Sequence, residues 1–322
     1  MASSTLGAMM TNLKTLVVAN PASGGGLLGR QWGRVSDAIR AAFGPFEHRF
    51  TESGDHAPRI TREALEAGFE QVVALGGDGT ISGVASGFMD GDQPVNPDAV
   101  LGVLPLGTGG DFRKTVKISK DLKKSAAALR GRASRPLDIG RLHYTTHAGD
   151  QASSHFVNIA SFGMSGLVDR YVNESDKALG GTLSFLTSTL RAATTYRNQP
   201  VEVQLDDTDR YSMKIINLAV ANGQFFGGGM RVAPYARPDD GYLDAVAIGD
   251  FSPLEMVRFG HRIYLGSHLG HPKVRTDRVR RLEAHPTNPD DHVLLDVDGE
   301  TPGRLPATFS VLPGALNLKI ID

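Results

Sequence analysis

Three apolar segments near the start of this 322-residue chain each end in a glycine-rich turn. Residues 16–19 (LVVA), 71–75 (QVVAL) and 100–104 (VLGVL) precede the turns NPASGGGLLG, GGDGT and PLGTGGDF, respectively. Uninterrupted apolar runs of this length are typical of strands buried on both faces of a parallel sheet. After the first turn, apolar residues at helical spacing predict a helix that lies on the sheet: Leu28, Trp32, Val35, Ile39 and Phe43. The pattern therefore predicts a three-layer, Rossmann-like α/β domain.

The chain after about Pro136 has a different pattern. Short β-type runs occur at 138–144, 155–160, 213–221, 242–248 and 293–297, and they predict a second domain of the antiparallel β-sandwich type. Two helices are expected among them, one over 183–196 and one opened by the capping box of Ser252, Pro253 and Glu255. We therefore expect one domain over 12–136 and another over 137–322, with the last strand as a candidate to return to the first domain.

Composition excludes several classes of protein. A hydrophobic content of 40%, a charged content of 21% and a formal charge of −1 are those of an ordinary globular protein. Cysteine is absent, which excludes disulfides, thiolate zinc sites and a catalytic thiol. The first ten residues lack the basic and apolar regions of a signal peptide, and no segment approaches the roughly 18 apolar residues of a membrane span. We expect a cytoplasmic protein whose contact with a membrane is peripheral.

The first glycine turn matches a dinucleotide-binding pattern. Gly24, Gly26 and Gly29 form G-x-G-x-x-G between a strand and a helix, and Glu47 follows about 20 residues later. An NAD(P)-dependent oxidoreductase is therefore one reading, and a turn required only for packing is another. The motif itself means that main-chain N–H groups can approach a phosphate closely, which any nucleotide enzyme can use. A Walker A loop is excluded, because no Gly-Lys-Ser/Thr follows the turn.

The second and third turns place acids and hydroxyls among glycines. In GGDGT, Asp78 can organise magnesium directly or through water, and Thr80 can donate to a phosphate oxygen from a helix start. The turn at 107–111 repeats the combination with Thr108 and Asp111. Ligands bind at the carboxyl ends of strands in such sheets, so two adjacent turns of this kind predict a polyphosphate site. An ordinary Asp-Gly turn is the structural alternative.

An ordered series of motifs resembles the diacylglycerol kinase catalytic domain family, which includes soluble bacterial lipid kinases, sphingosine kinases and ceramide kinases. The motifs span nearly the whole chain: NPASGGG at 20–26, GGDGT at 76–80, PLGTGGDF at 105–112, ASFGMSG at 160–166, PDDGYLD at 238–244 and DGE at 298–300. GGDGT alone is shared with NAD kinases, so it identifies only the superfamily. The later motifs favour the lipid branch.

This resemblance implies ATP and Mg²⁺ as cofactors and assigns residues to each. The residues implied for ATP are Asn20, Pro21, Ala22, Ser23, Gly24, Thr51, Gly76, Gly77, Asp78, Gly79, Thr80, Ile81, Ser82 and Thr108. Those implied for a metal are Asp240 and the main chain at Arg237 and Tyr242, and those implied for the catalytic base are Asp298 and Glu300. Asp111 and Asp169 are implied on the side of the lipid substrate, and Asp169 falls where sphingosine kinases place an acid that recognises the lipid head group. A solvated helix acid remains the alternative for Asp169.

Two positions depart from the family pattern. The family commonly has Asn where this chain has Gly110, and often Asn where it has Ser82. Each change removes an amide that could bind a neighbouring loop or a phosphate, which affects the fine geometry of the site and not the class of enzyme.

A run of basic residues predicts a contact with an anionic membrane. Residues 113–135 hold nine lysines and arginines and one acid, Asp121, for a net charge of +8. Such a surface attracts anionic lipid by about 1 kcal/mol for each suitably placed basic group. A solvated helix face is the alternative, since Leu122, Ala126 and Leu129 form a normal inward stripe. Nucleic acid is a poorer explanation, because no aromatic residues interleave the run.

The mechanism expected from these assignments is direct in-line transfer of the γ-phosphate to a lipid hydroxyl at the inner face of the membrane. If the DGE segment is extended, Asp298 and Glu300 point the same way, and the pair can accept the proton of the hydroxyl. A surface hairpin is the alternative structure for this segment. NAD kinase, an NAD(P)-dependent oxidoreductase and a catalytically silent lipid sensor are the competing functions. The sequence leaves open the particular lipid and whether the chain forms a homodimer.

Overall fold

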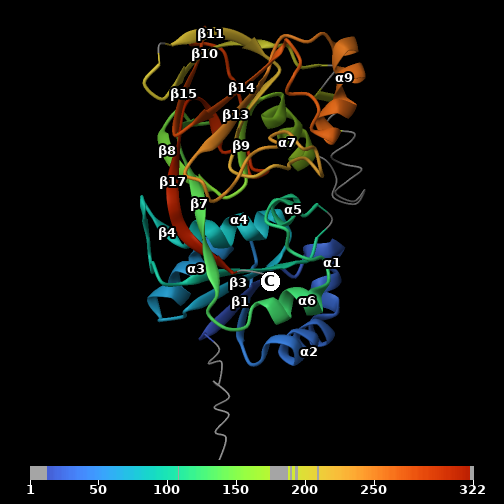
Figure 1. Ribbon diagram of the computed structural model, residues 1–322, viewed down its shortest axis with the longest axis vertical. Coiled ribbons are helices and arrows are strands. Elements are labelled where there is room, and N and C mark those ends of the chain that lie inside the picture. The colour runs from blue at the N-terminus through green and yellow to red at the C-terminus, as the bar shows by residue number, and fades with distance from the viewer. Residues whose placement is uncertain are drawn as a thin grey trace, which may run out of the picture.

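The computed structural model describes residues 13–107, 109–174, 188, 191–192, 195–208 and 210–319. Its N-terminal half forms the lower part of the molecule in Figure 1, and the β-rich half forms the upper part. One long C-terminal strand, shown in red, runs through both. None of the helices in the described part of the chain is long and apolar enough to cross a membrane.

The N-terminal half contains a parallel sheet. Its strands lie in the order β2 (Glu47–Phe50), β1 (Thr15–Ala19), β3 (Gln71–Gly76) and β6 (Val100–Pro105). All three neighbouring pairs are parallel. The apolar runs in β1, β3 and β6 are almost completely buried, as the sequence predicted for central strands.

Helices cover both faces of this sheet, so the predicted three-layer α/β fold is confirmed. α3 (His56–Glu66) and α4 (Asp78–Gly87) pack on one face. The opposite face is covered by α1 (Ser23–Arg30), α2 (Trp32–Phe43) and α6 (Leu122–Ala128). The predicted helix through Leu28 and Phe43 is divided between α1 and α2, because Gln31 has a φ of −117° and interrupts the helical backbone.

The β-rich half is an antiparallel sandwich, as predicted. One sheet has the order β14 (Val274–Val279), β13 (Leu243–Ile248), β12 (Asn217–Ala221), β9 (Ile159–Gly163) and β16 (Leu295–Val297). The facing strands are β7 (Ser134–Thr146), β8 (Gln151–Phe156), β10 (Gln199–Leu205), β11 (Tyr211–Ile215), β15 (Arg281–Pro286) and β17 (Gly303–Lys319). The core between the sheets is apolar and includes Phe162 stacked on Phe309 with ring centroids 5.8 Å apart.

Two predicted strands are each divided between the two sheets. The run 155–160 ends β8 in one sheet and begins β9 in the other. The run 213–221 divides in the same way between β11 and β12. Each run was predicted as one strand, and this was wrong because a chain that crosses between packed sheets must leave its first hydrogen-bonded ladder. An apolar run carries no signal for such a crossing.

β17 connects the two halves. It pairs antiparallel with β7 and β15, and its last residues pair parallel with β6 through Asn317 opposite Val100 and Leu318 opposite Leu101. The parallel sheet is therefore continuous with one sheet of the sandwich, which gives ten strands in all among the described residues.

Two helices lie on the outer side of the five-stranded sheet (Figure 1). α7 (Met164–Glu174) contacts β9 and β16. α9 (Pro253–Leu265) packs through Phe259 and Ile263 and begins with the predicted capping box, in which Glu255 Oε2 accepts from Ser252 N at 2.7 Å. The predicted helix over 183–196 lies largely outside the described residues. The remaining elements are α5 (Asp111–Thr115) and the short hairpin of β4 (Met89–Asp90) and β5 (Gln93–Pro94).

Candidate active site

The first glycine turn lies at the carboxyl end of β1. Gly24, Gly25 and Gly26 have φ values of 63°, 67° and 78°, a left-handed region that other residues rarely adopt. Asn20 Oδ1 accepts from Ala22 N at 2.9 Å and fixes the start of the turn. Thr51 N donates to Ala19 O at 2.9 Å, so the predicted segment 20–24 and Thr51 lie at adjacent strand ends.

The second and third glycine turns touch each other through their main chains. A Cβ atom on Gly107 would lie 3.0 Å from Gly77 Cα, and one on Gly76 would lie 2.4 Å from Thr80 Oγ1. A larger residue at Gly107 would therefore force the turns apart, and one at Gly76 would displace Thr80 within the second turn. Thr80 and Ile81 are buried in the first turn of α4, and Ile81 belongs to the core. Thr108 lies outside the described residues.

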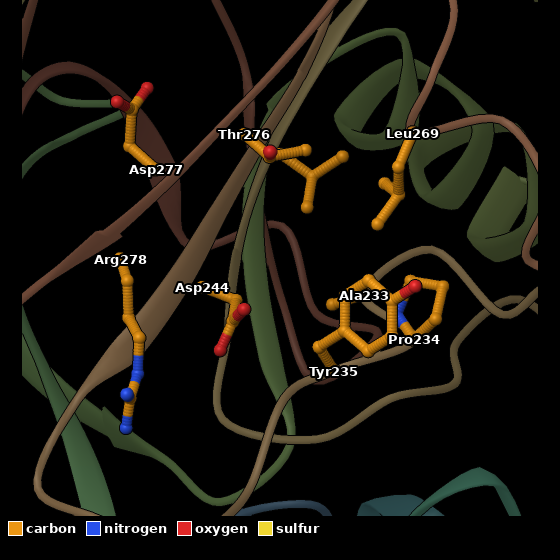
Figure 2. A pocket seen from close by; sticks show the side chains of 9 residues that line it. Ala233, Pro234, Tyr235, Asp244, Leu269, Thr276, Asp277 and Arg278 are labelled. Atoms are coloured by element: carbon orange, nitrogen blue, oxygen red, sulfur yellow. The ribbon is translucent and has the colours of Figure 1, made fainter.

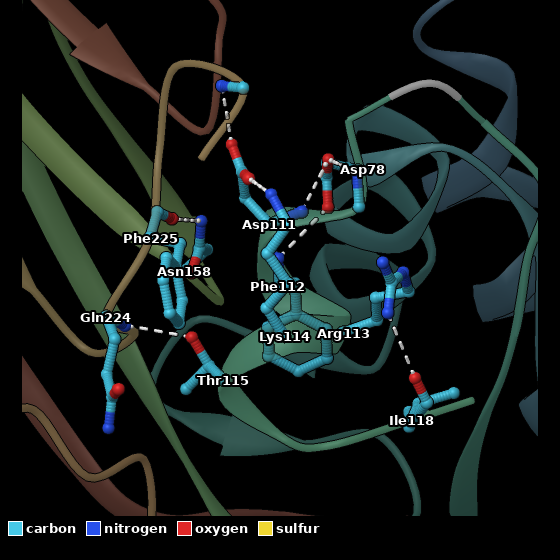
Figure 3. Close-up of polar contacts among 12 residues, drawn as sticks. Asp78, Asp111, Phe112, Arg113, Lys114, Thr115, Ile118, Asn158, Gln224 and Phe225 are labelled. Carbon is cyan, nitrogen blue, oxygen red and sulfur yellow. Dashed lines mark hydrogen bonds and ion pairs between the residues drawn. The ribbon is translucent and has the colours of Figure 1, made fainter. Parts of the chain in front are cut away.

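Asp78 joins the two turns (Figure 3). Its Oδ2 accepts from Gly110 N at 2.8 Å and Asp111 N at 3.1 Å, and its Oδ1 accepts from Phe112 N at 3.1 Å. The carboxylate thus satisfies free N–H groups at the start of α5. Gly110 has a left-handed φ of 67°, a conformation that Asn tolerates better than most residues. This backbone requirement explains why Gly and Asn are both compatible with the position.

Asp111 connects the N-terminal half to the sandwich (Figure 3). Its Oδ1 pairs with Lys114 Nζ at 2.7 Å, and its Oδ2 accepts from Gly228 N at 2.8 Å. One further hydrogen bond joins the same halves, from Gln224 N to Thr115 Oγ1 at 2.9 Å, and Asn158 Nδ2 holds the loop of Gln224 within the sandwich by donating to Phe225 O at 2.9 Å. Both carboxylate oxygens of Asp111 therefore have partners within the protein.

Asp298 makes a second connection between the halves. Its carboxylate accepts from Ser82 Oγ at 2.7 Å and from the main-chain N–H groups of Val157, Asn158 and Ile159 at 2.9, 3.1 and 2.9 Å. Burial raises the pKa of Asp298 to about 6, although these four donors favour the charged form. Since Ser82 supplies one of the donors, its hydroxyl replaces the amide that is common at this position in the family.

The DGE segment is a tight turn and not an extended strand. Asp298 and Gly299 have φ values of 50° and 92°, and Val297 and Glu300 exchange main-chain hydrogen bonds at 2.8 and 3.0 Å. Left-handed backbone at both central positions is typical of an Asp-Gly hairpin turn. The expectation of an extended segment was therefore wrong. Asp298 turns inward, whereas Glu300 is exposed.

Asp169 and Asp296 form a buried pair of acids beside this turn. Asp296 Oδ1 accepts from Gly299 N at 3.0 Å, and its Oδ2 accepts from Ser161 Oγ at 3.1 Å. Burial, followed by the nearby charge of Asp296, raises the pKa of Asp169 well above its usual value, and burial also raises the pKa of Asp296. Two close carboxylates in a buried site favour sharing one proton. Asp169 thus lies beside Asp296 and is not an ordinary solvated helix acid.

The side chain of Asp240, the carboxylate implied for a metal, has partners within the protein. Asp240 Oδ1 accepts from Tyr242 N at 3.1 Å, and its Oδ2 contacts Arg278 Nη2. Arg237 is exposed, and its Nε lies 3.8 Å from Asp239. Within the described ranges, no group of three or more His, Asp or Glu side chains is arranged to hold a metal ion.

Asp138, which was not among the predicted site residues, holds the PDDGYLD turn in place. Its two carboxylate oxygens accept from Gly241 N and Gly314 N, each at 2.7 Å, and the residue is buried. The sequence feature that indicates this role is the single acid between Leu137 and Ile139, in a run otherwise typical of a core strand. A buried carboxylate needs partners, so such a position marks a long-range contact.

A pocket of about 230 Å³ lies on the sandwich, between the loop at 233–235 and strands β13 and β14 (Figure 2). Its lining residues are Ala233, Pro234, Tyr235, Asp244, Val246, Leu269, Thr276, Asp277 and Arg278. Burial, followed by the nearby charge of Asp240, raises the pKa of Asp244 to about 6. None of the residues predicted for the nucleotide or the base lines this pocket.

The fold and the connected turns are those of a lipid kinase of the diacylglycerol kinase class. Residues 14–142 match the diacylglycerol kinase catalytic domain, and residues 158–320 match the YegS C-terminal NAD kinase beta sandwich-like domain. The chain is 33% identical over 271 residues to a Pseudomonas aeruginosa protein named "Probable lipid kinase YegS-like", covering 84% of this chain and 82% of that one. This chain therefore belongs to the diacylglycerol kinase family.

Two further comparisons agree with this assignment. The diacylglycerol kinase of Bacillus subtilis is 26% identical over 295 residues, covering 91% of each chain. The crystal structure of a diacylglycerol kinase from Bacillus anthracis superposes with a TM-score of 0.68 at 19% identity, covering 95% of this chain and 96% of that one. At this identity the superposition supports the fold alone.

Proposed function

We propose that the protein transfers the γ-phosphate of ATP to a hydroxyl group of a membrane lipid. The observation that carries the proposal is the 2.7 Å contact between Ser82 Oγ and Asp298. It joins the helix that starts in GGDGT to an acidic turn more than 200 residues later in the chain. Membership of the diacylglycerol kinase family supports the same chemistry.

The glycine turns fit a bound triphosphate. Main chain without Cβ atoms at Gly24, Gly25 and Gly26 leaves space for phosphate, and a Cβ on Gly25 would meet no atom within 4 Å. The start of α4 adds free N–H groups and a favourable dipole. Magnesium in such sites is held by phosphate oxygens, waters and only one or two carboxylates. Asp78 fits this role, because Oδ1 accepts one hydrogen bond in the structure and keeps a lone pair.

In this proposal Asp298 is the base. Three of its four donors are main-chain N–H groups that cannot turn away, whereas the Ser82 hydroxyl can rotate. An acceptor hydroxyl can therefore take the place of Ser82 at Oδ2 and give up its proton there. A pKa of about 6 leaves the carboxylate charged at neutral pH and a better proton acceptor than an ordinary aspartate. In this proposal the lipid acceptor binds on the side of Asp298 where Glu300, Asp169 and Asp296 lie.

The exposed part of the basic run supports an electrostatic contact with the membrane. Lys117, Lys120, Lys123, Lys124 and Arg130 are exposed. Others in the run have acidic partners, such as Arg132 with Glu70 at 3.0 Å and Lys114 with Asp111. The predicted inward stripe is buried in the core beneath α6. These exposed side chains can therefore lie near anionic lipid, while α6 is held by its packing.

The test is incubation with γ-labelled ATP, magnesium and a panel containing diacylglycerol, sphingosine, ceramide, phosphatidylglycerol and NAD. Labelled lipid is the expected product. Labelled NAD would replace the proposal with an NAD kinase, hydride transfer without label would indicate an oxidoreductase, and no product with any acceptor would indicate a silent lipid sensor. The variants Asp298→Asn and Glu300→Gln, each first shown to be folded, identify the base.

A further inference from the structure

The outer face of α9 carries apolar side chains that are largely exposed in the described part of the structure. Leu254, Tyr264 and Leu265 are 62%, 54% and 70% exposed, and Tyr235 in a neighbouring loop is 76% exposed. The described part of the chain has six exposed large hydrophobic residues, and four of them are these. Single exposed apolar residues are ordinary, whereas a group on one surface indicates an interaction site.

The four residues belong to one surface. Arg231 N donates to Ile263 O at 3.1 Å, and a Cβ atom on Gly266 would lie 3.0 Å from Pro234 Cγ, so the loop that carries Tyr235 packs on the end of α9. Within the helix, the positions of Leu254, Arg258, His261 and Leu265 repeat at steps of four, three and four, which places them on one face.

This surface is also cationic. Arg258 and Arg262 are exposed between the two leucines. Glu255, the only acid of α9, contacts Lys273 Nζ at 2.8 Å and caps the helix start. Leucine and tyrosine combined with arginine on one helix face are typical of a helix that lies in the interface of an anionic bilayer.

We propose that the α9 surface, defined as Tyr235, Leu254, Arg258, Arg262, Tyr264 and Leu265, docks on an anionic phospholipid bilayer. This inference rests on the proposed function, because a lipid acceptor must be reached from the bilayer. α9 lies on the same side of the five-stranded sheet as α7, which carries Asp169 (Figure 1). Docking through α9 therefore turns the side of the active site proposed to bind the lipid acceptor toward the membrane.

A second copy of the chain fits this surface less well. In a two-fold contact the same face meets itself, so Arg258 and Arg262 of each copy would approach like charges. An anionic bilayer instead supplies opposite charge to the arginines and apolar depth for the leucines.

The test is sedimentation with sucrose-loaded vesicles of phosphatidylcholine, with and without phosphatidylglycerol. The double variant Leu254→Ser/Leu265→Ser is expected to reduce the vesicle partition coefficient about tenfold or more, because two apolar side chains no longer enter the interface. Arg258→Glu/Arg262→Glu is expected to reduce the additional binding that phosphatidylglycerol provides, to which the basic run at 113–135 also contributes, and to leave binding to pure phosphatidylcholine vesicles unchanged. The matched control is Leu27→Ser, an exposed leucine in α1 of the other half, which is expected to leave partitioning unchanged.

Unchanged binding of the leucine variant, or an equal loss in Leu27→Ser, overturns the proposal. A wild-type dimer that Leu254→Ser/Leu265→Ser dissociates in sedimentation velocity overturns it in favour of a second copy. Activity toward a water-soluble, short-chain diacylglycerol without vesicles is expected to be unchanged in the leucine variant, which shows that its fold is intact. If the wild type phosphorylates no lipid at all, the proposed function fails, whereas the vesicle result still decides the docking surface.

Discussion

The substitution Asp298→Asn separates the proposed chemistry of this residue from its role in holding the two halves together. If the amide oxygen takes the place of Oδ1, it still accepts from Asn158 N and Ile159 N. The NH₂ group then faces Val157 N–H, which loses its acceptor at a cost of about 1–3 kcal/mol. Ser82 Oγ can rotate to accept from the NH₂ group.

Removing the buried charge offsets this cost. The pKa of Asp298, raised by burial from 3.8 to about 6, corresponds to about 3 kcal/mol of preference for the neutral form in the fold, at about 1.4 kcal/mol for each pKa unit. The two effects nearly cancel, so we expect the unfolding free energy of the variant in urea at pH 7.5 to stay within about 2 kcal/mol of the wild type. Asp298→Ala also removes the buried charge but leaves three main-chain N–H groups without an acceptor, at about 1–3 kcal/mol each, so it is expected to be less stable than Asp298→Asn.

Activity should respond differently from stability. Without a base at this position, kcat at saturating ATP and lipid is expected to fall about 10²-fold to 10⁴-fold in Asp298→Asn. The comparison variant Ser82→Ala keeps the carboxylate of Asp298 but loses one of its hydrogen-bond donors, which raises the pKa of Asp298 further. Its activity should persist, but the fall in kcat/KM at acidic pH should begin at a higher pH than in the wild type. A folded Asp298→Asn enzyme with a kcat within a few-fold of the wild type would refute the assignment of the base.

Four further predictions follow from the geometry. Because Asp298 must be charged to accept a proton, log(kcat/KM) should fall by about one for each pH unit below about pH 6, and a flat profile there would contradict its role. Gly107→Ala places a Cβ 3.0 Å from Gly77 Cα and should raise the KM for ATP more than that for lipid, whereas the control Gly33→Ala, whose Cβ meets no atom within 4 Å, should change neither. Asp78→Ala leaves three N–H groups at the start of α5 without their acceptor, so both the stability in urea and the affinity for ATP should fall. Because the pKa of Asp169 is raised, its contribution to stability is present below about pH 4 and is lost as pH rises; the melting temperature of Asp169→Asn should therefore gain on that of the wild type as pH is raised above about 4, and a constant difference would argue against the buried pair.

Several features of this protein were determined by its sequence because they depend on interactions over a few residues. Apolar runs specified the buried strands β1, β3 and β6, and helical spacing specified the helices on the sheet. The capping box at Ser252 and the glycines of the turns act on their own local backbone. The order of the glycine and acid motifs was sufficient to predict the family and the α/β and β-sandwich architecture.

The tertiary structure alone decided which groups meet. Asp78, Asp138 and Asp298 are held mainly by main-chain N–H groups, and every residue except proline carries the same N–H donor. The sequence therefore cannot show which donors a carboxylate will find. Sheet register and the crossing of strands between sheets bring Ser82 to Asp298 and Asp111 to Gly228, and these depend on packing over the whole chain. The inward position of Asp298 and the exposed face of α9 were decided in the same way, because burial is a property of the folded chain.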